Sequence, residues 1–297
     1  MSDPAPGSLK VWLLAARPKT LPAAAAPVIM GVAMAGEAGA LHVPSAVCAL
    51  LGALLIQIGT NLANDYFDFV KGLDTPDRLG PTRATQAGLT TPGRMKAATI
   101  AVFSLAFVIG LYLVYRGGWP ILLIGVLSIL FGVLYTGGPA PLGYIGVADF
   151  FVLIFFGPVA VGGTYYVQAL ALPWHVVLAG FGPGFLSTAI LTVNNLRDID
   201  GDRRAGRKTL AVRFGKGFAR GEYVCCVTAA AVLVPGAIVL ALGAHYPLLL
   251  VLLTVIAAVP QVRRVYTLTG RPLNDVLAGT GKLTLLYSLL FSMGWLL

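Results

Sequence analysis

Charge is what this chain of 297 residues has least of: Asp, Glu, Lys and Arg make up 11% of it, against roughly 25% in soluble globular domains. Hydrophobic residues make up 57%, and the mean hydropathy is +0.84. Apolar stretches of about 20 residues, the length that crosses a bilayer, recur from end to end. The sequence therefore predicts an integral membrane protein and excludes a cytosolic enzyme, a disordered chain and a disulfide scaffold.

Cysteine and histidine are also scarce. The three cysteines lie inside apolar runs without metal-ligand spacing, which predicts small packing residues: Cys48, Cys225 and Cys226. The three histidines lie beside loops on the opposite side from the acidic clusters described below: His42, His175 and His245. Histidine-based catalysis and a histidine metal site are therefore not expected. The first ten residues have no apolar core followed by a cleavage site, so we expect no removable signal peptide.

Hydropathy, with breaks at Gly, Pro and charged residues, predicts an all-α fold. About nine transmembrane helices are expected around a central cavity, in one domain over residues 1–297. They are placed near 20–36, 44–69, 96–115, 119–136, 148–170, 174–200, 222–243, 245–262 and 276–297.

The basic residues are distributed unevenly between the two sides of this arrangement. The N-terminal tail and the loops at 71–96, 203–220 and 263–271 carry many cations, whereas the opposite loops carry one, Arg116. The positive-inside rule then places the N-terminus and the cation-rich loops in the cytoplasm and the C-terminus outside. The net charge of +9 is thus explained by membrane topology, and no nucleic-acid partner is expected.

Seven of the twelve acidic residues fall in two short clusters, each running out of the cytoplasmic end of a predicted helix. The first extends over residues 61–77 and the second over residues 194–203. At 100° per residue, Asn61, Asp65 and Asp68 share one helix face. Asn64, Asp68 and Lys71 form the adjoining stripe.

The second cluster repeats the pattern, because Asn194, Asp198 and Asp202 are spaced at i, i+4 and i+8, with Asn195 beside them. Carboxylates one turn apart repel each other, and a bound cation relieves that repulsion. Donor sets made only of oxygen suit Mg²⁺, Mn²⁺ or Ca²⁺, and Mg²⁺ commonly shares its ligands with substrate phosphates. Two such faces across a cavity therefore favour a metal-diphosphate clamp. Pairing of the acids with neighbouring Lys and Arg is the less favoured interpretation, since ionisable groups inside membranes are functional by default.

Basic residues next to the clusters are candidates for phosphate contacts: Lys71, Arg83, Arg207 and Lys208. Five other cations are expected to set topology or meet anionic lipid: Arg94, Lys96, Arg220, Arg263 and Arg264. Tyr135 and Tyr144 flank a Gly/Pro-rich segment on the same side. Their rings can shield a developing cation, or they belong to the ordinary aromatic belt of the membrane interface.

Taken together, these residues closely resemble the UbiA-type superfamily of intramembrane prenyltransferases over nearly the whole chain. Within it they are most similar to the branch acting on 1,4-dihydroxy-2-naphthoate. The resemblance rests on residues 16–22, 64–68, 74–81, 135–139, 155–161, 194–198 and 205–213. Where the superfamily pattern has an acidic residue four positions after Asp68, this chain has Gly72, and Asp74 is the nearest substitute.

The resemblance implies transfer of a polyprenyl group from its diphosphate to 1,4-dihydroxy-2-naphthoate, with loss of CO₂ and pyrophosphate, in a prokaryotic cell membrane. Mg²⁺, with Mn²⁺ as an alternative, is implied at Asn64, Asp65, Asp68, Asp74, Asp198 and Asp202. The implied diphosphate contacts are Asn64, Lys71, Arg83, Asn195, Arg207 and Lys208, and the implied catalytic set is Asp68, Asp198, Lys71 and Tyr135. A UbiA-type enzyme with another acceptor, such as 4-hydroxybenzoate, and a cation-coupled transporter are the alternatives. Neither prenyl chain length nor oligomeric state is expected to follow from these residues.

Overall fold

A computed structural model describes residues 8–73, 78–243 and 245–297, and every regular element in these ranges is a helix. The first half of the chain forms α1 (Leu9–Ala16), η1 (Pro18–Thr20), α2 (Leu21–Glu37), α3 (Val43–Val70), α4 (Pro92–Gly117), α5 (Trp119–Leu134) and α6 (Leu142–Ile145). The second half forms α7 (Ala148–Ile154), η2 (Phe155–Val159), α8 (Ala160–Ala169), α9 (Trp174–Arg204), α10 (Leu210–Thr228), η3 (Ala229–Leu233), α11 (Val234–Leu242), η4 (Tyr246–Leu252), α12 (Leu253–Thr267) and α13 (Leu273–Leu296).

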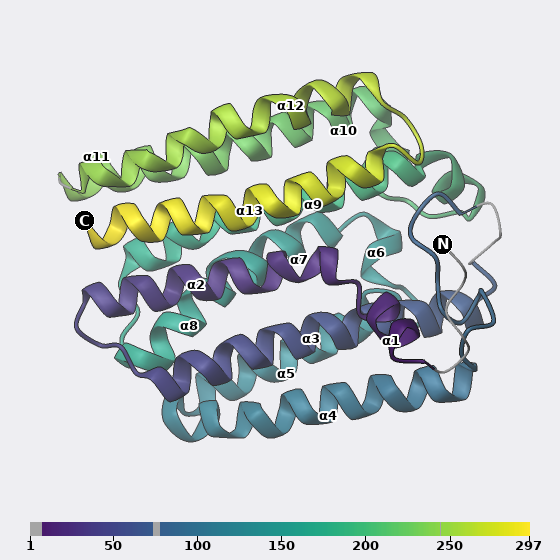
Figure 1. Cartoon of the computed structure of the whole chain (residues 1–297), viewed down its shortest axis with the longest axis horizontal. Coiled ribbons are helices and arrows are strands. Elements are labelled where there is room, and N and C mark those ends of the chain that lie inside the picture. Colours follow the sequence, from purple (N-terminus) through teal and green to yellow (C-terminus); the bar gives the residue numbers. More distant parts are fainter. Residues whose placement is uncertain (1–7, 74–77, 244) are drawn as a thin grey trace.

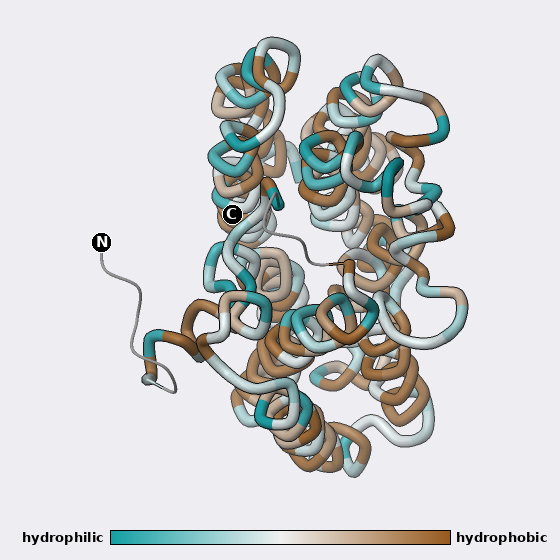
Figure 2. Tube along the Cα trace, turned by 90° about the vertical axis from the view of Figure 1, so that its right-hand side faces the viewer, coloured by the Kyte–Doolittle hydropathy of each residue, from teal (hydrophilic) through white to brown (hydrophobic). Residues whose placement is uncertain are grey.

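The predicted multi-spanning architecture is confirmed. Within the described ranges, eight helical segments are long and apolar enough to cross a membrane, and α5 is a shorter apolar helix of 16 residues. The long helices run side by side along one axis (Figure 1). Helices α1 and α6 lie at one end of the bundle, and the C-terminus lies at the other. Figure 2, viewed from the α1 end, shows brown, hydrophobic residues concentrated in the lower helices of the bundle, whereas the upper helices show more hydrophilic residues at this end.

Several boundaries differ from those that hydropathy predicted, and two of them bear on the site. The helix expected from 222 begins at Leu210, where the Thr209 hydroxyl accepts a hydrogen bond from the Val212 N–H at 3.3 Å and caps it. Its first turns mix cations with apolar residues, so their mean hydropathy is low, and the backbone is kinked at Gly215, whose φ is 86°. Helix α9 continues to Arg204, which places the whole second acidic cluster on helical backbone.

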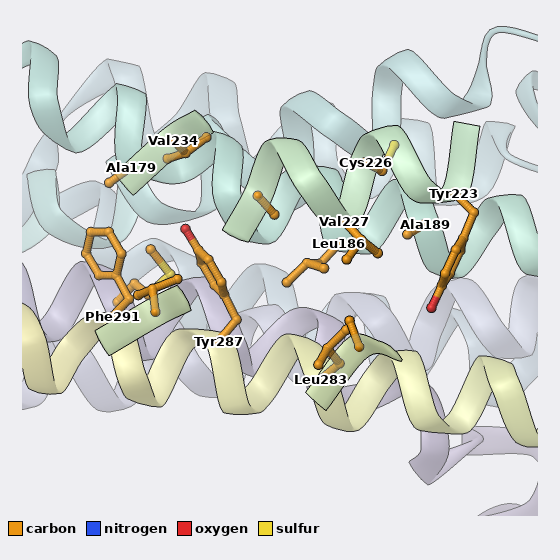
Figure 3. Packing of buried hydrophobic residues seen from close by; sticks show 14 of the residues in the cluster. Ala179, Leu186, Ala189, Tyr223, Cys226, Val227, Val234, Leu283, Tyr287 and Phe291 are labelled. Atoms are coloured by element: carbon orange, nitrogen blue, oxygen red, sulfur yellow. The ribbon is translucent and has the colours of Figure 1, made fainter. Parts of the chain in front are cut away.

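The largest core cluster joins α2, α9, α10, α11 and α13. In Figure 3, Leu283, Tyr287 and Phe291 of α13 meet side chains of α9 and α10. Tyr223 of α10 and Thr280 of α13 share a hydrogen bond of 2.9 Å between their hydroxyl oxygens. Glycine is required at position 182, because a Cβ there would lie 2.0 Å from the Tyr287 hydroxyl oxygen. This dense half of the bundle fixes α9 and its acidic end.

A second, smaller cluster attaches α1 to the acidic end of α3. It contains Val11, Ala15, Leu62, Ala84, Leu89 and Met95. Ala84 and Leu89 belong to the connection between α3 and α4, so this connection is packed beneath α1. On the side facing α1, the acidic end of α3 is therefore covered by the connection between α3 and α4.

Candidate active site

A cavity of about 420 Å³ lies between α2, α3, α4, α5, α7–α8 and α9. Its walls are mostly apolar along the helices, and aromatic rings line it where η2 bends at Gly157 and Pro158: Phe151, Phe155 and Phe156. At one end the lining becomes polar and charged: Arg17, Asn64, Asp68, Arg78, Arg83, Asn194, Asn195, Asp198, Asp202 and Arg207. The two acidic clusters, far apart in sequence, thus meet in one cavity.

Asp68 is the most heavily bonded carboxylate of this charged end, and it is only 2% exposed. It accepts hydrogen bonds from Arg83 Nη2 at 2.8 Å, from Arg207 Nη2 at 3.3 Å and from the Tyr144 hydroxyl. Neighbouring Asn64 lines the cavity, and its side-chain oxygen accepts a hydrogen bond from the Thr136 hydroxyl at 2.8 Å. The last turns of α3 therefore present both residues to the cavity.

Asp65, three residues earlier, faces a different partner. Its carboxylate accepts hydrogen bonds from the backbone N–H groups of Ala84 at 2.8 Å and Thr85 at 3.0 Å. The residue is 2% exposed and does not line the cavity. Although Asp65 and Asp68 share a helix face, Asp65 binds the loop between α3 and α4, whereas Asp68 lines the cavity.

In the second cluster, Arg197 donates hydrogen bonds to three neighbouring polar side chains. Its guanidinium donates to Asp198 (Nε, 2.9 Å), to Asn194 (Nη2, 2.8 Å) and to Asn274 of α13 (Nη1, 2.7 Å). Asn195 lines the cavity beside them and is 7% exposed. One buried arginine thus orients the oxygen donors at this end of α9.

Arg207 connects the two clusters. It donates to Asp202 at 3.1 Å and to Asp68 at 3.3 Å, and its guanidinium carbon lies 4.4 Å from the centroid of the Tyr144 ring. Burial lowers the pKa of Arg207, but the negative charges of Asp68 and Asp202 outweigh it, so that the pKa is raised above its usual value. Burial, followed by the charge of Asp68, raises the pKa of the Tyr144 phenol well above its usual value. Tyr144 is therefore protonated at neutral pH and donates to Asp68.

Lys71 and Lys208, like Asp65, lie outside the cavity lining although they were predicted site residues. The Lys71 ammonium group donates to the carbonyl oxygens of Thr136 at 2.6 Å and Gly138 at 3.2 Å, outside the cavity lining. The Lys208 side chain is exposed, and the backbone N–H of this residue donates to the carbonyl oxygen of Tyr144 at 2.6 Å. Asp74 lies outside the described residues. The predicted Tyr135 does line the cavity.

Arg17, Tyr144 and Asn274 line or support the site but were not in the predicted catalytic, diphosphate or metal sets. Arg17 lines the cavity from a left-handed backbone conformation, φ 52°, that non-glycine residues rarely adopt, and its buried Nη2 has no hydrogen-bond partner among the described residues. In the sequence, Arg17 was indicated only by its position in residues 16–22, one of the segments that carry the family resemblance. Tyr144 was predicted, together with Tyr135, either to shield a cation or to belong to the aromatic belt, and no local pattern indicated Asn274.

The oxygen donors at the charged end suit a divalent cation that is shared with a substrate. Among the described residues, no three His, Cys, Asp or Glu side chains come close enough to form a metal cage. Mg²⁺ is instead commonly held by one or two carboxylates and completed by substrate phosphates. Carboxylates and amides on two helices, facing a cavity that also contains arginines, fit that shared mode. The unpartnered Nη2 of Arg17 fits an anion in the same space.

Fold and site together define a polytopic membrane protein whose cavity joins a charged end to an apolar tunnel. The chain belongs to the UbiA prenyltransferase family, whose model matches residues 24–295. It is 45% identical to the 1,4-dihydroxy-2-naphthoate octaprenyltransferase of Escherichia coli (strain K12), covering 73% of this chain and 72% of that protein. It is 37% identical to the protein of the same name from Haemophilus influenzae, covering 97% and 96%. The fold is similar to that of a UbiA homolog from Archaeoglobus fulgidus bound to DMAPP and Mg²⁺, with a TM-score of 0.66 and 17% identity, covering 96% and 98%.

Proposed function

We propose that the protein transfers a polyprenyl group from polyprenyl diphosphate to 1,4-dihydroxy-2-naphthoate, releasing CO₂ and pyrophosphate and forming demethylmenaquinol, the reduced form of demethylmenaquinone. The observation that carries the proposal is the cavity itself, in which two acidic clusters and several arginines lie at one end of an apolar tunnel. The names of the relatives above support the naphthoate acceptor.

The shape of the cavity matches an amphiphilic substrate. A diphosphate head is placed at the charged end, where Arg17, Arg83 and Arg207 provide guanidinium donors for phosphate oxygens. The isoprenoid tail lies along the apolar walls, past Phe107 and Leu111 of α4 and toward the bilayer. Its apolar surface then remains out of water throughout the reaction.

Mg²⁺, bound together with the diphosphate, would be held by oxygen donors of the two clusters: Asn64, Asp68, Asp198 and Asp202. When bound, the ion neutralises the negative charge that develops on the departing pyrophosphate. Mn²⁺ offers similar oxygen coordination. Support for a divalent ion comes from the donor set and from the Mg²⁺ in the A. fulgidus homolog.

The protein's own residues supply positioning and charge. Arg83 and Arg207 hold Asp68 in place before substrate arrives, so little reorganisation is needed when the charged substrate binds. The Tyr135 ring faces the cavity and can stabilise the positive charge of the prenyl group as its bond to oxygen lengthens. The acceptor ring then attacks at its carboxyl-bearing carbon. Loss of CO₂ returns the bond electrons to the ring and restores aromaticity.

We place the charged end of the cavity at the cytoplasmic face of the cell membrane and the C-terminus outside. The cation-rich loops, together with α1 and α6, lie at the charged end of the bundle (Figure 1). This is the arrangement that the positive-inside rule favours. Water-soluble naphthoate would reach the site from the cytoplasm, and the prenyl substrate from the bilayer.

The acceptor is tested by incubating purified protein with geranylgeranyl diphosphate, Mg²⁺ and either 1,4-dihydroxy-2-naphthoate or 4-hydroxybenzoate. We expect mass spectrometry to find a prenylated naphthoquinol that has lost CO₂, and no product after chelation. Product from 4-hydroxybenzoate alone would mean that hydroxybenzoate, not the naphthoate, is the acceptor.

A cation-coupled transporter is the second candidate, but transporter sites typically lie near the membrane midplane on broken helices, whereas these acids lie at helix ends. Ion flux into proteoliposomes without prenyl transfer would favour it.

A further inference from the structure

The connection between α3 and α4 contains a short segment, Leu79–Leu89, that places the positively charged side chain of Arg83 in the cavity. Arg83 begins a single helical turn, in which the Ala87 N–H donates to the Arg83 carbonyl oxygen at 3.0 Å and the Leu89 N–H to that of Ala84 at 3.0 Å. Gly88 ends the turn with a left-handed φ of 71°. Arg83 itself is 4% exposed and reaches Asp68. The position of this turn therefore decides where the Arg83 charge lies.

Asp65 fixes the beginning of the turn. The first N–H groups of any helical turn have no partner within the turn. Here the Asp65 carboxylate accepts both, from Ala84 and Thr85, as an N-cap supplied by another helix. Ala84 is fully buried beneath α1, so water cannot replace the carboxylate at that N–H.

Asn274, in the first turn of α13, fixes the other end of the segment. Its amide nitrogen donates to the Leu79 carbonyl oxygen at 2.9 Å, and its amide oxygen accepts from Arg197 at 2.7 Å. Arg197 is the residue that orients Asp198. Gly80 allows this close approach, because a Cβ at position 80 would lie 2.9 Å from Arg197 Nη2. A single amide thus connects the segment of the first cluster to the arginine of the second.

We propose that Asp65 and Asn274 are positioning residues that hold Leu79–Leu89 in place, so that Arg83 meets Asp68 and Arg197 meets Asp198 before substrate binds. Neither residue lines the cavity, and each acts through an arginine. Asp65 is thereby assigned to the loop rather than to the metal. The proposal rests on the proposed function in so far as the positioned groups serve a diphosphate and its cation.

The first test uses Asp65→Asn and Asn274→Ala without substrate or metal. Trypsin cleaves after Arg83 only if the segment leaves its buried position. We expect both variants to be cut between Arg83 and Ala84 much faster than the wild type, with the fragments identified by mass. Matched controls are Asp200→Asn on the exposed side of α9 and Asp275→Ala, the exposed neighbour of Asn274. Wild-type cleavage rates in both test variants would overturn the proposal.

The second test measures binding of geranylgeranyl diphosphate with Mg²⁺ by calorimetry. We expect Asp65→Asn to raise the Kd about tenfold, as removal of outer partners of a site commonly does. In an Arg83→Ala background, the same change should alter the Kd by less than about twofold, because Asp65 acts through Arg83. An equal effect in both backgrounds would mean that Asp65 binds the cation or diphosphate directly, and would refute the positioning role.

If Asp65→Asn does not fold, Gly80→Ala tests the same contact from the Asn274 side. Its added methyl group displaces either the segment or Arg197, and it should raise the Kd and expose the Arg83–Ala84 bond to trypsin. Unchanged Kd and cleavage in Gly80→Ala would count against the proposal. Neither measurement uses an aromatic acceptor, so a wrong naphthoate assignment leaves them valid. A wild type that does not bind the prenyl diphosphate would refute the proposed function, while the cleavage pattern would still report the anchoring.

Discussion

Replacing Arg207 with alanine should destabilise the protein, because this residue neutralises two buried carboxylates. Its guanidinium contacts Asp68 and Asp202, whose side chains are 3% and 7% exposed. Removing one partner of a buried ion pair costs about 3–5 kcal/mol, since the remaining charge is left without compensation. Asp68 keeps its hydrogen bonds from Arg83 and Tyr144, so we expect the lower end, about 3 kcal/mol, arising mainly at Asp202.

The assay is unfolding of the purified protein in detergent, compared for Arg207→Ala, Asp202→Ala and the double variant. The double variant should recover most of the stability that Arg207→Ala loses, because the unpaired charge at Asp202 is then absent. Mg²⁺ should also stabilise Arg207→Ala more than the wild type, since a cation between the clusters replaces the missing charge. Wild-type stability of Arg207→Ala, or an equal loss in the double variant, would refute the reasoning.

Three further predictions concern the site and its support. Asp68→Ala and Asp198→Ala should each abolish prenyl transfer while leaving a folded protein; near-normal turnover in a purified variant would reject that residue's role. Chelation of divalent ions should remove activity without lowering the unfolding temperature, because among the described residues the protein alone forms no metal cage; a large fall in that temperature would indicate a structural metal. Gly182→Ala should cost about 1–3 kcal/mol through overpacking against Tyr287, and unfolding curves that match the wild type would contradict this packing.

Hydropathy was sufficient to predict the long helices, because a bilayer requires about 20 apolar residues at each crossing. It failed at residues 210–221, where a helix kinked at Gly215 mixes cations and apolar residues and has no strong hydropathy signal. The helical spacing of Asn194, Asp198 and Asp202 correctly placed these residues on one helix, because periodicity is a local property of the chain.

Contacts between distant segments could not be predicted in this way. The spacing of Asp65 and Asp68 places them on one side of α3, but nothing local indicates that the backbone of Ala84 and Thr85 returns to occupy Asp65. Asn274 meets Arg197 across 77 residues of sequence. Such pairings depend on helix packing, which a single sequence does not reveal.

The central claim is that the charged end and the apolar tunnel serve prenyl transfer to a naphthoate. The most direct measurement is product mass after incubating purified protein with geranylgeranyl diphosphate, Mg²⁺ and 1,4-dihydroxy-2-naphthoate. The account predicts a geranylgeranylated naphthoquinol lacking the carboxyl group, absent after chelation and absent with Asp68→Ala. A folded wild-type protein that binds both substrates and forms no prenylated product would contradict it.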